Sequence, residues 1–128
     1  MSSLKYIELK SGYSDNGPAW IALVDGSKSG RTIYFNGLAL KRASGIKGNY
    51  IDTVSRAEYW VSGVKKSGTN RHSAGSGRVL VEAAALPELL KQLGTTTLDS
   101  KVFAVTNDIR PTSAGEFVAS ENSSRESE

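Results

Sequence analysis

Short apolar runs alternate with turn-forming residues over roughly the first two thirds of the chain. Residues 4–10 are rich in strand-forming side chains, and residues 19–24 form an apolar run short enough for a buried strand. Residues 31–35 and 38–42 flank Asn36-Gly37, which is the strongest hairpin signal in the sequence. The same criteria predict further strands at residues 50–54, 58–66, 71–74 and 78–81.

The predicted strand at residues 58–66 alternates with a period of two, so Tyr59 and Trp60 point to opposite faces. The same holds for the adjacent rings of Tyr34 and Phe35 in an earlier strand. Each of these pairs presents one ring to each side of a sheet. At least one ring of each pair is therefore expected to lie in the core.

The spacing of apolar residues becomes helical after the last of these strands. Leucines recur at helical spacing up to Leu93, Pro87 suits a first helical turn, and Gly94 is a natural C-terminal stop. One helix is therefore predicted within residues 83–93. A further strand is predicted at residues 101–106.

Many short strands, glycine-rich turns and one late helix predict a mostly β fold at the margin of the α+β class. We expect a small antiparallel barrel or a strongly bent sheet with one C-terminal helix, because one helix cannot supply the crossovers of a parallel sheet. Apolar content falls after residue 106. A single domain is therefore predicted over residues 1–106, followed by a polar, disordered tail at residues 107–128.

Composition is that of one ordinary globular domain, with 128 residues of which 38% are hydrophobic and 23% charged. There is no cysteine, which excludes disulfides, thiolate metal sites and cysteine nucleophiles and fits a reducing compartment. No apolar run approaches the roughly 18 residues of a membrane span, and the first residues lack the apolar core of a signal peptide. A cytoplasmic location without a membrane partner is expected.

Charge is distributed unevenly along the chain. Residues 1–81 carry 12 Lys/Arg and 5 Asp/Glu, whereas residues 82–128 carry 4 Lys/Arg and 8 Asp/Glu. This asymmetry indicates either a basic face for an anionic partner or an acidic tail that covers such a face. A mixed, solvated surface with accidental segregation is the alternative.

No metal site or cofactor is predicted, because His72 is the only histidine and no cysteine is present to complete a ligand set. No Gly-x-Ser-x-Gly elbow accompanies a possible serine nucleophile. His72 is nevertheless a candidate general acid or base of a small metal-independent nuclease, with Arg71 and Lys65 stabilising a phosphate. The alternative role for His72 is that of a hydrogen-bonded structural residue.

Aromatic, basic and glycine residues are dense between positions 34 and 77. Small barrels that bind single-stranded nucleic acid combine a positive groove with exposed aromatic platforms for base stacking. A second hairpin turn predicted at residues 67–70 would display the basic side chains, and the following glycines could form an anion-binding nest. The candidate ligand-binding residues are Tyr34, Tyr59, Trp60, Lys65, Lys66, Arg71, His72, Gly75, Gly77 and Arg78.

Several stretches together resemble a family of short uncharacterised bacterial proteins over about residues 4–93. They are residues 5–13 and 15–20, Tyr34-Phe35-Asn36-Gly37, residues 58–66, Gly68, Arg71-His72 and Gly75-Ser76-Gly77. Some members of that family are labelled 1-deoxy-D-xylulose-5-phosphate synthase, but the resemblance implies no established activity. We reject a thiamine-dependent synthase here, because that chemistry requires large α/β domains and a Gly-Asp-Gly motif. This chain has only Val24-Asp25-Gly26.

The leading hypothesis is therefore a non-enzymatic binding module for an anionic partner, either single-stranded nucleic acid or an acidic protein surface. The basic side chains would provide the electrostatic attraction, and one of the three aromatic candidates a stacking surface. A small metal-independent nuclease that uses His72 is one alternative. A structural or self-associating protein is the other.

Overall fold

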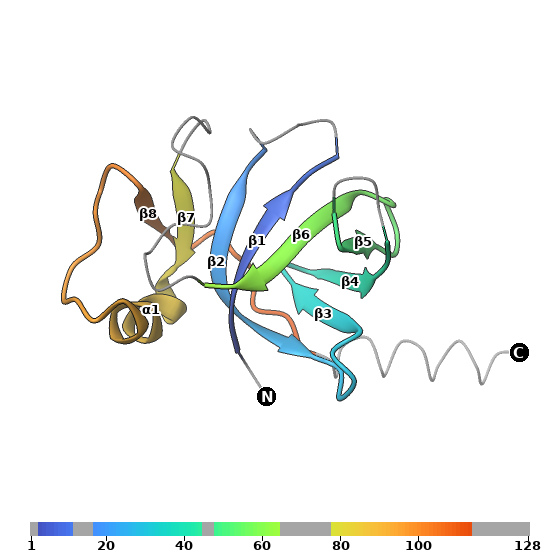
Figure 1. Cartoon of the computed structure of the whole chain (residues 1–128), viewed down its shortest axis with the longest axis horizontal. Coiled ribbons are helices and arrows are strands. Elements are labelled where there is room, and N and C mark those ends of the chain that lie inside the picture. The colour runs from blue at the N-terminus through green and yellow to red at the C-terminus, as the bar shows by residue number, and fades with distance from the viewer. Residues whose placement is uncertain (1–2, 12–16, 45–47, 65–77, 114–128) are drawn as a thin grey trace, which may run out of the picture.

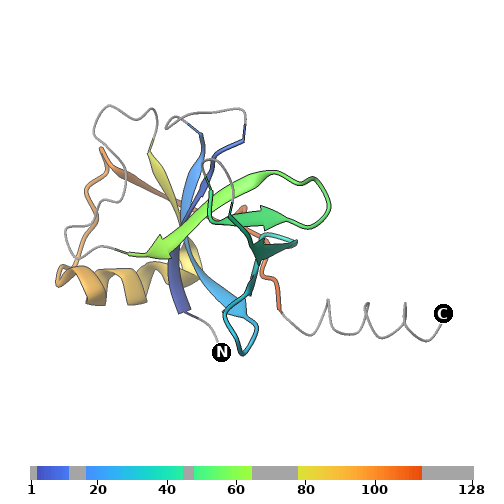
Figure 2. The ribbon, with the colours of Figure 1, turned by 45° about the vertical axis from the view of Figure 1, so that its right-hand side comes forward.

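In the part of the chain that the structure describes, the fold consists of eight strands, one 3₁₀ segment and one α-helix (Figure 1 and Figure 2). The structure, a computed structural model, describes residues 3–11, 17–44, 48–64 and 78–113. The strands are β1 (Ser3–Leu9), β2 (Ala19–Gly26), β3 (Thr32–Phe35), β4 (Leu38–Arg42), β5 (Tyr50–Asp52), β6 (Glu58–Gly63), β7 (Val79–Glu82) and β8 (Phe103–Thr106). The helical elements are η1 (Ala83–Ala85) and α1 (Leu86–Leu93). The strand predicted at residues 71–74 lies outside the described residues.

Six of the strands close into an antiparallel barrel. Their order is β1-β6-β5-β4-β3-β2, and β1 also pairs with β2, so the sheet returns on itself. The β3–β4 hairpin turns at Asn36 and Gly37, whose φ angles of 49° and 81° are those that a two-residue hairpin requires. The prediction of a small, mostly β barrel with one C-terminal helix is confirmed.

Strands β7 and β8 extend the sheet beyond the barrel and run parallel to their neighbours. Trp20 and Ile21 in the first half of β2 pair with β7, which in turn pairs with β8. The second half of β2 pairs with β3 instead. At this change of partner the Glu82 carboxylate accepts a hydrogen bond from the Leu23 nitrogen at 3.0 Å. The apolar pattern alone does not predict these two parallel pairings. Helix α1 lies in the crossover connection from β7 to β8, and strands β3 to β6 lie in the longer connection from β2 to β7.

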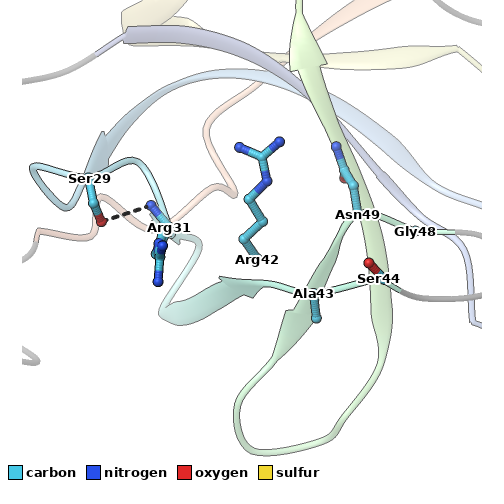
Figure 3. A pocket seen from close by; sticks show the side chains of 7 residues that line it. All are labelled: Ser29, Arg31, Arg42, Ala43, Ser44, Gly48 and Asn49. Atoms are coloured by element: carbon cyan, nitrogen blue, oxygen red, sulfur yellow. Dashed lines mark hydrogen bonds between the residues drawn. The ribbon is translucent and has the colours of Figure 1, made fainter.

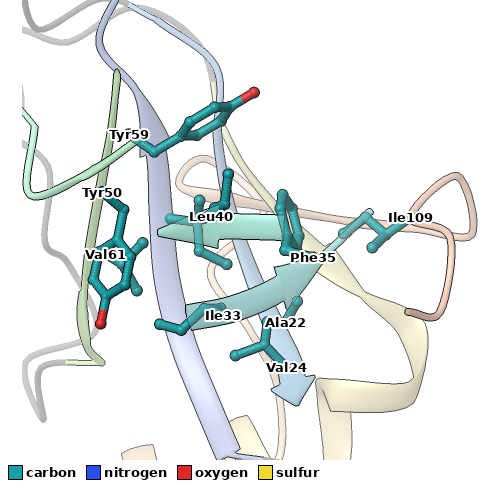
Figure 4. Packing of buried hydrophobic residues seen from close by; sticks show 10 residues of the cluster. Ala22, Val24, Ile33, Phe35, Leu40, Tyr50, Tyr59, Val61 and Ile109 are labelled. Carbon is teal, nitrogen blue, oxygen red and sulfur yellow. The ribbon is translucent and has the colours of Figure 1, made fainter. Parts of the chain in front are cut away.

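Two clusters of buried residues lie on opposite faces of β1 and β2. The barrel cluster fills the interior (Figure 4) and contains Ile7, Ala22, Val24, Ile33, Phe35, Leu40, Tyr50, Tyr59, Val61 and Ile109. The outer cluster includes Leu89 of α1, and its other members are Tyr6, Ala19, Ile21, Val64, Val79, Val81 and Phe103. Successive residues such as Tyr6 and Ile7 therefore serve different clusters, as the period of a strand requires.

Helix α1 lies within the predicted residues 83–93 and ends at the predicted stop, whereas Ala83–Ala85 form the 3₁₀ segment η1. Pro87 lies in its first turn, and Gly94 follows its last residue with a left-handed φ of 70°. The Gly94 nitrogen donates to the carbonyl oxygens of Leu90 and Lys91, which closes the C-terminus. Among the described residues, no helix is long and apolar enough to span a membrane.

One end of the barrel is closed by the chain that follows β8. Ile109 is buried beyond Phe35 (Figure 4), while the Arg110 nitrogen donates to Asn36 Oδ1 at 2.9 Å. The Gly37 nitrogen donates to Thr112 Oγ1 at 2.6 Å. The sequence analysis places residues 107–113 in the polar tail because few of them are apolar. In the structure the buried Ile109 side chain and these hydrogen bonds hold the segment against the barrel.

Gly48→Ala is expected to lower the free energy of unfolding by about 1–3 kcal/mol, because the new side chain meets backbone. A Cβ at Gly48 would lie 2.5 Å from the Tyr59 carbonyl oxygen and 2.9 Å from the Tyr59 nitrogen. Gly63→Ala is the matched control, since a Cβ there meets no atom within 4 Å. Its effect on urea unfolding should stay within about 0.5 kcal/mol. Equal effects of the two substitutions would contradict the close approach at Gly48.

Candidate anion-binding site

The aromatic residues predicted from the sequence divide between the core and the surface. Tyr34 and Tyr59 are each 8% exposed, whereas Trp60 is 42% exposed. Tyr59 belongs to the barrel cluster, and burial raises its pKa above the ordinary value of 10.0, with the nearby charge of Asp52 as a smaller cause. Of these three rings, only that of Trp60 offers a large surface to a partner.

Trp60 lies on the outer face of β6, opposite Glu8 on β1. Glu8 is 4% exposed, and its carboxylate accepts hydrogen bonds from the Tyr6 hydroxyl and, at 2.8 Å, from the Lys10 ammonium. The Glu8 carboxylate therefore has hydrogen-bond partners both in β1 itself and in Lys10, the first residue after β1. Trp60 is an exposed ring beside a satisfied polar cluster.

The basic residues predicted from the sequence are only partly described. Arg78 is exposed and its guanidinium donates to the Ser100 carbonyl oxygen at 3.4 Å. The remaining candidates lie outside the described residues, so their placement and the nuclease role of His72 stay predictions. These residues are Lys65, Lys66, Arg71, His72, Gly75 and Gly77.

A different group of cations lines the end of the barrel opposite Ile109. Lys5 stands two residues before the interior residue Ile7, and Arg31 stands two residues before Ile33. Residues two apart share a face of a strand, so Lys5 lies on the inward face of β1 and Arg31 continues that of β3. Both are one inward position closer to the same end of the barrel than Ile7 and Ile33. Arg42 occupies the equivalent position two residues after Leu40 and pairs with Tyr50.

We define the open end of the barrel by the inward-facing positions Lys5, Gly26, Arg31, Arg42, Tyr50 and Gly63. Strands β2 and β6 place only glycines there. Gly26 lies two residues after the interior Val24 on β2, and Gly63 lies two residues after the interior Val61 on β6. Two of the six inward positions therefore carry no side chain. Tyr50 forms part of the floor, and its hydroxyl donates to the Gly30 carbonyl oxygen at 2.8 Å. Among the described residues the two ends of the barrel thus differ, because one is apolar and closed by Ile109 and the other is open and basic.

Two hollows lie at the open end. The larger, which we call the arginine hollow, measures about 680 Å³ and is lined by Ser29, Arg31, Arg42, Ala43, Ser44, Gly48 and Asn49. Figure 3 shows the Arg42 side chain extending between the Ser29–Arg31 segment and Asn49. The second hollow measures about 480 Å³ and is lined by Ser3, Lys5, Val24, Asp25, Gly26, Ser27, Lys28, Gly30, Ile33 and Tyr50.

Hydrogen bonds to the backbone hold the walls of the arginine hollow. The Asn49 amide pairs with Val61 like a strand, donating to its carbonyl oxygen at 2.8 Å and accepting from its nitrogen at 2.7 Å. The Arg42 nitrogen donates to the Arg31 carbonyl oxygen at 2.7 Å, which fixes the spacing of the two arginine backbones. Among the described residues, neither arginine side chain forms an ion pair with a carboxylate.

Exposed charge on the barrel is entirely positive within the described part of residues 3–64. Five basic residues are exposed there, namely Lys28, Arg31, Lys41, Arg42 and Arg56, whereas no Asp or Glu is exposed. The acidic residues of this part accept hydrogen bonds from the protein itself. Asp25 accepts from the Gly26 nitrogen, Asp52 from the turn after β5, and Glu58 from the Gly48 nitrogen.

Arg31 and Arg42 give the arginine hollow a positive lining, which suits an anion. The described residues contain no group of three His, Asp or Glu side chains that would hold a metal ion. The sequence analysis did not select Arg31 and Arg42, although the register of the Asn36-Gly37 hairpin places them opposite each other. In comparisons with known proteins, no family model, curated protein or solved structure matches this chain.

Proposed function

We propose that this chain is a non-enzymatic binding module for an anionic partner, and that the open end of the barrel binds it. The observation that carries the proposal is the segregation of charge on the barrel. Its exposed ionised side chains are all cationic in the described part of residues 3–64, while its carboxylates bond within the protein. Such a surface attracts polyanions over the range of a Debye length.

Single-stranded nucleic acid is the partner class that these features favour. Arginine forks bind phosphate oxygens in pairs, and small antiparallel barrels present basic grooves of suitable size. Trp60 adds one exposed ring that can stack on a base, on the outer face of β6. An acidic protein would use the same charges but would gain nothing specific from a stacking surface.

Fluorescence anisotropy with a single-stranded oligonucleotide of about 20 nucleotides tests this proposal. Binding is expected at low salt and should weaken steeply as salt rises. The double variant Arg31→Gln/Arg42→Gln should weaken binding at least about tenfold. It should also flatten the salt dependence by about 1.4 in the slope of log K, the value for two lost phosphate contacts on a single strand.

The matched control is Lys91→Gln/Lys101→Gln, which removes the same charge from exposed residues of the α1–β8 segment. This control should retain nearly all of the affinity. Equal weakening by both double variants would show a nonspecific charge effect and contradict a site at the open end. Polyglutamate of equal length that binds as tightly as the oligonucleotide would favour an acidic protein as the partner.

A further inference from the structure

The arginine hollow is a pocket at the end of a filled barrel and not part of a channel. Behind it the interior is occupied by the barrel cluster, and Ile109 closes the far end. A polymer cannot thread through such a barrel. The hollow therefore suits a compact group, such as the end of a chain or a small molecule.

The donors that line the hollow match an anion with several oxygens. Arg31 and Arg42 each present a guanidinium fork, and the Ser29 and Ser44 hydroxyls lie in the same lining. None of the described residues in this lining is Asp or Glu. A volume of about 680 Å³ falls in the range of small-molecule sites and leaves room for more than a single ion.

The lining also lacks features that would recognise a base. No aromatic residue is among the described residues that line the arginine hollow, and Trp60 belongs to the outer face of β6 instead. The described lining carries two positive side chains and no carboxylate, which about two negative charges on a ligand would match. A phosphomonoester carries about −1.5 to −2 at neutral pH, whereas a carboxylate carries only a single charge.

We infer that the arginine hollow binds a phosphomonoester group, held by Arg31 and Arg42. This inference rests on the proposed function, because it assigns the chemical class of the anion to the same open end. Two sources carry this chemistry, a terminal phosphate on a nucleic acid strand and a phosphorylated small molecule. Internal phosphodiesters would then bind along the basic surface outside the hollow.

A pair of oligonucleotides that differ only in a 5′-terminal phosphate tests the inference with the full chain. The phosphorylated strand is expected to bind about tenfold more tightly, and phenyl phosphate should compete for this difference. The preference should be lost in Arg31→Gln/Arg42→Gln and kept in Lys91→Gln/Lys101→Gln. Arg42→Lys keeps the charge but not the fork, so it should keep general binding while losing much of the preference.

The pH dependence separates a phosphomonoester from other anions. The second ionisation of a phosphomonoester has a pKa near 6, so the preference should grow as pH rises from about 5 to 7. The unmodified strand should show no such growth. A preference that does not change over this range would overturn the inference.

The remaining outcomes distinguish this inference from the proposed function. If both strands bind equally and the arginine double variant weakens both, the binding function stands and the phosphomonoester site is overturned. If phenyl phosphate binds with the same arginine dependence but neither strand does, the site is supported with a small-molecule source and the nucleic acid function fails. If nothing binds at low salt, both fail.

Discussion

Leu89→Ala is expected to lower the free energy of unfolding by about 2–5 kcal/mol, a large share of the stability of a domain of this size. Leu89 is 0% exposed and is the one fully buried side chain of α1. The helix has only eight residues, too few to be stable without packing. Truncation would leave a cavity in the outer cluster and weaken the packing that holds α1 against β7 and β8.

The matched control is Leu90→Ala, which removes the same atoms from a half-buried position in the same helix. It should cost less than half as much. Urea unfolding monitored by far-UV circular dichroism and by tryptophan fluorescence gives both values. The two signals should coincide, because the barrel cluster and the outer cluster share β1 and β2 and so unfold together. A loss of helix signal before the fluorescence change would show instead that the outer layer melts separately.

The local pattern of apolar and turn-forming residues predicts the strands and the helix, because each element depends on residues that are close in the sequence. The turn at Asn36-Gly37 fixes its hairpin through the positive φ angles that these two residues tolerate. Gly94 ends α1 for the same reason. Alternation also predicts that one ring of Tyr59-Trp60 is buried, as found. Such features depend on a few adjacent positions and need no knowledge of the partner strand.

The partner of a strand does not depend on neighbouring residues. For this reason the sequence pattern does not predict the pairing of β7 with β2. One signal does exist in the strand itself. Val79 and Val81 are buried and Leu80 is half-buried, so β7 is apolar on both faces. Continuous apolar strands of this kind are typical of parallel sheets covered on both sides. That signal indicates a covered strand but does not identify its neighbour.

Part of the open end of the barrel, the pairing of Arg31 with Arg42, could be predicted from the sequence. A two-residue loop at Asn36-Gly37 sets the register, so that Ile33 pairs with Leu40 and the next inward pair is Arg31 with Arg42. Composition alone instead favours the region around position 65, where charged and aromatic residues are denser. That Lys5 reaches the same end required the closure of the barrel, which depends on the pairing of β1 with both β2 and β6.

Ile109→Ala is expected to lower the free energy of unfolding by about 2–4 kcal/mol, although sequence composition alone assigns this residue to a tail. Ile109 is 7% exposed and packs into the end of the barrel, where Trp20 and Phe35 also meet at a centroid distance of 5.4 Å. Its loss would also loosen the hydrogen bonds that the following residues make to the β3–β4 turn.

Val105→Ala is the control for this substitution, because Val105 precedes Ile109 by four residues but is 50% exposed. It should cost no more than about 0.5 kcal/mol. Urea unfolding of the full chain provides the comparison, and tryptophan fluorescence should respond to Ile109→Ala through the environment of Trp20. If the two substitutions had equal, small effects, residues 107–113 would lie against the barrel without stabilising it. A large effect confined to Ile109→Ala would show that this one apolar side chain stabilises the closed end of the barrel, and that residues 107–113 belong to the folded domain.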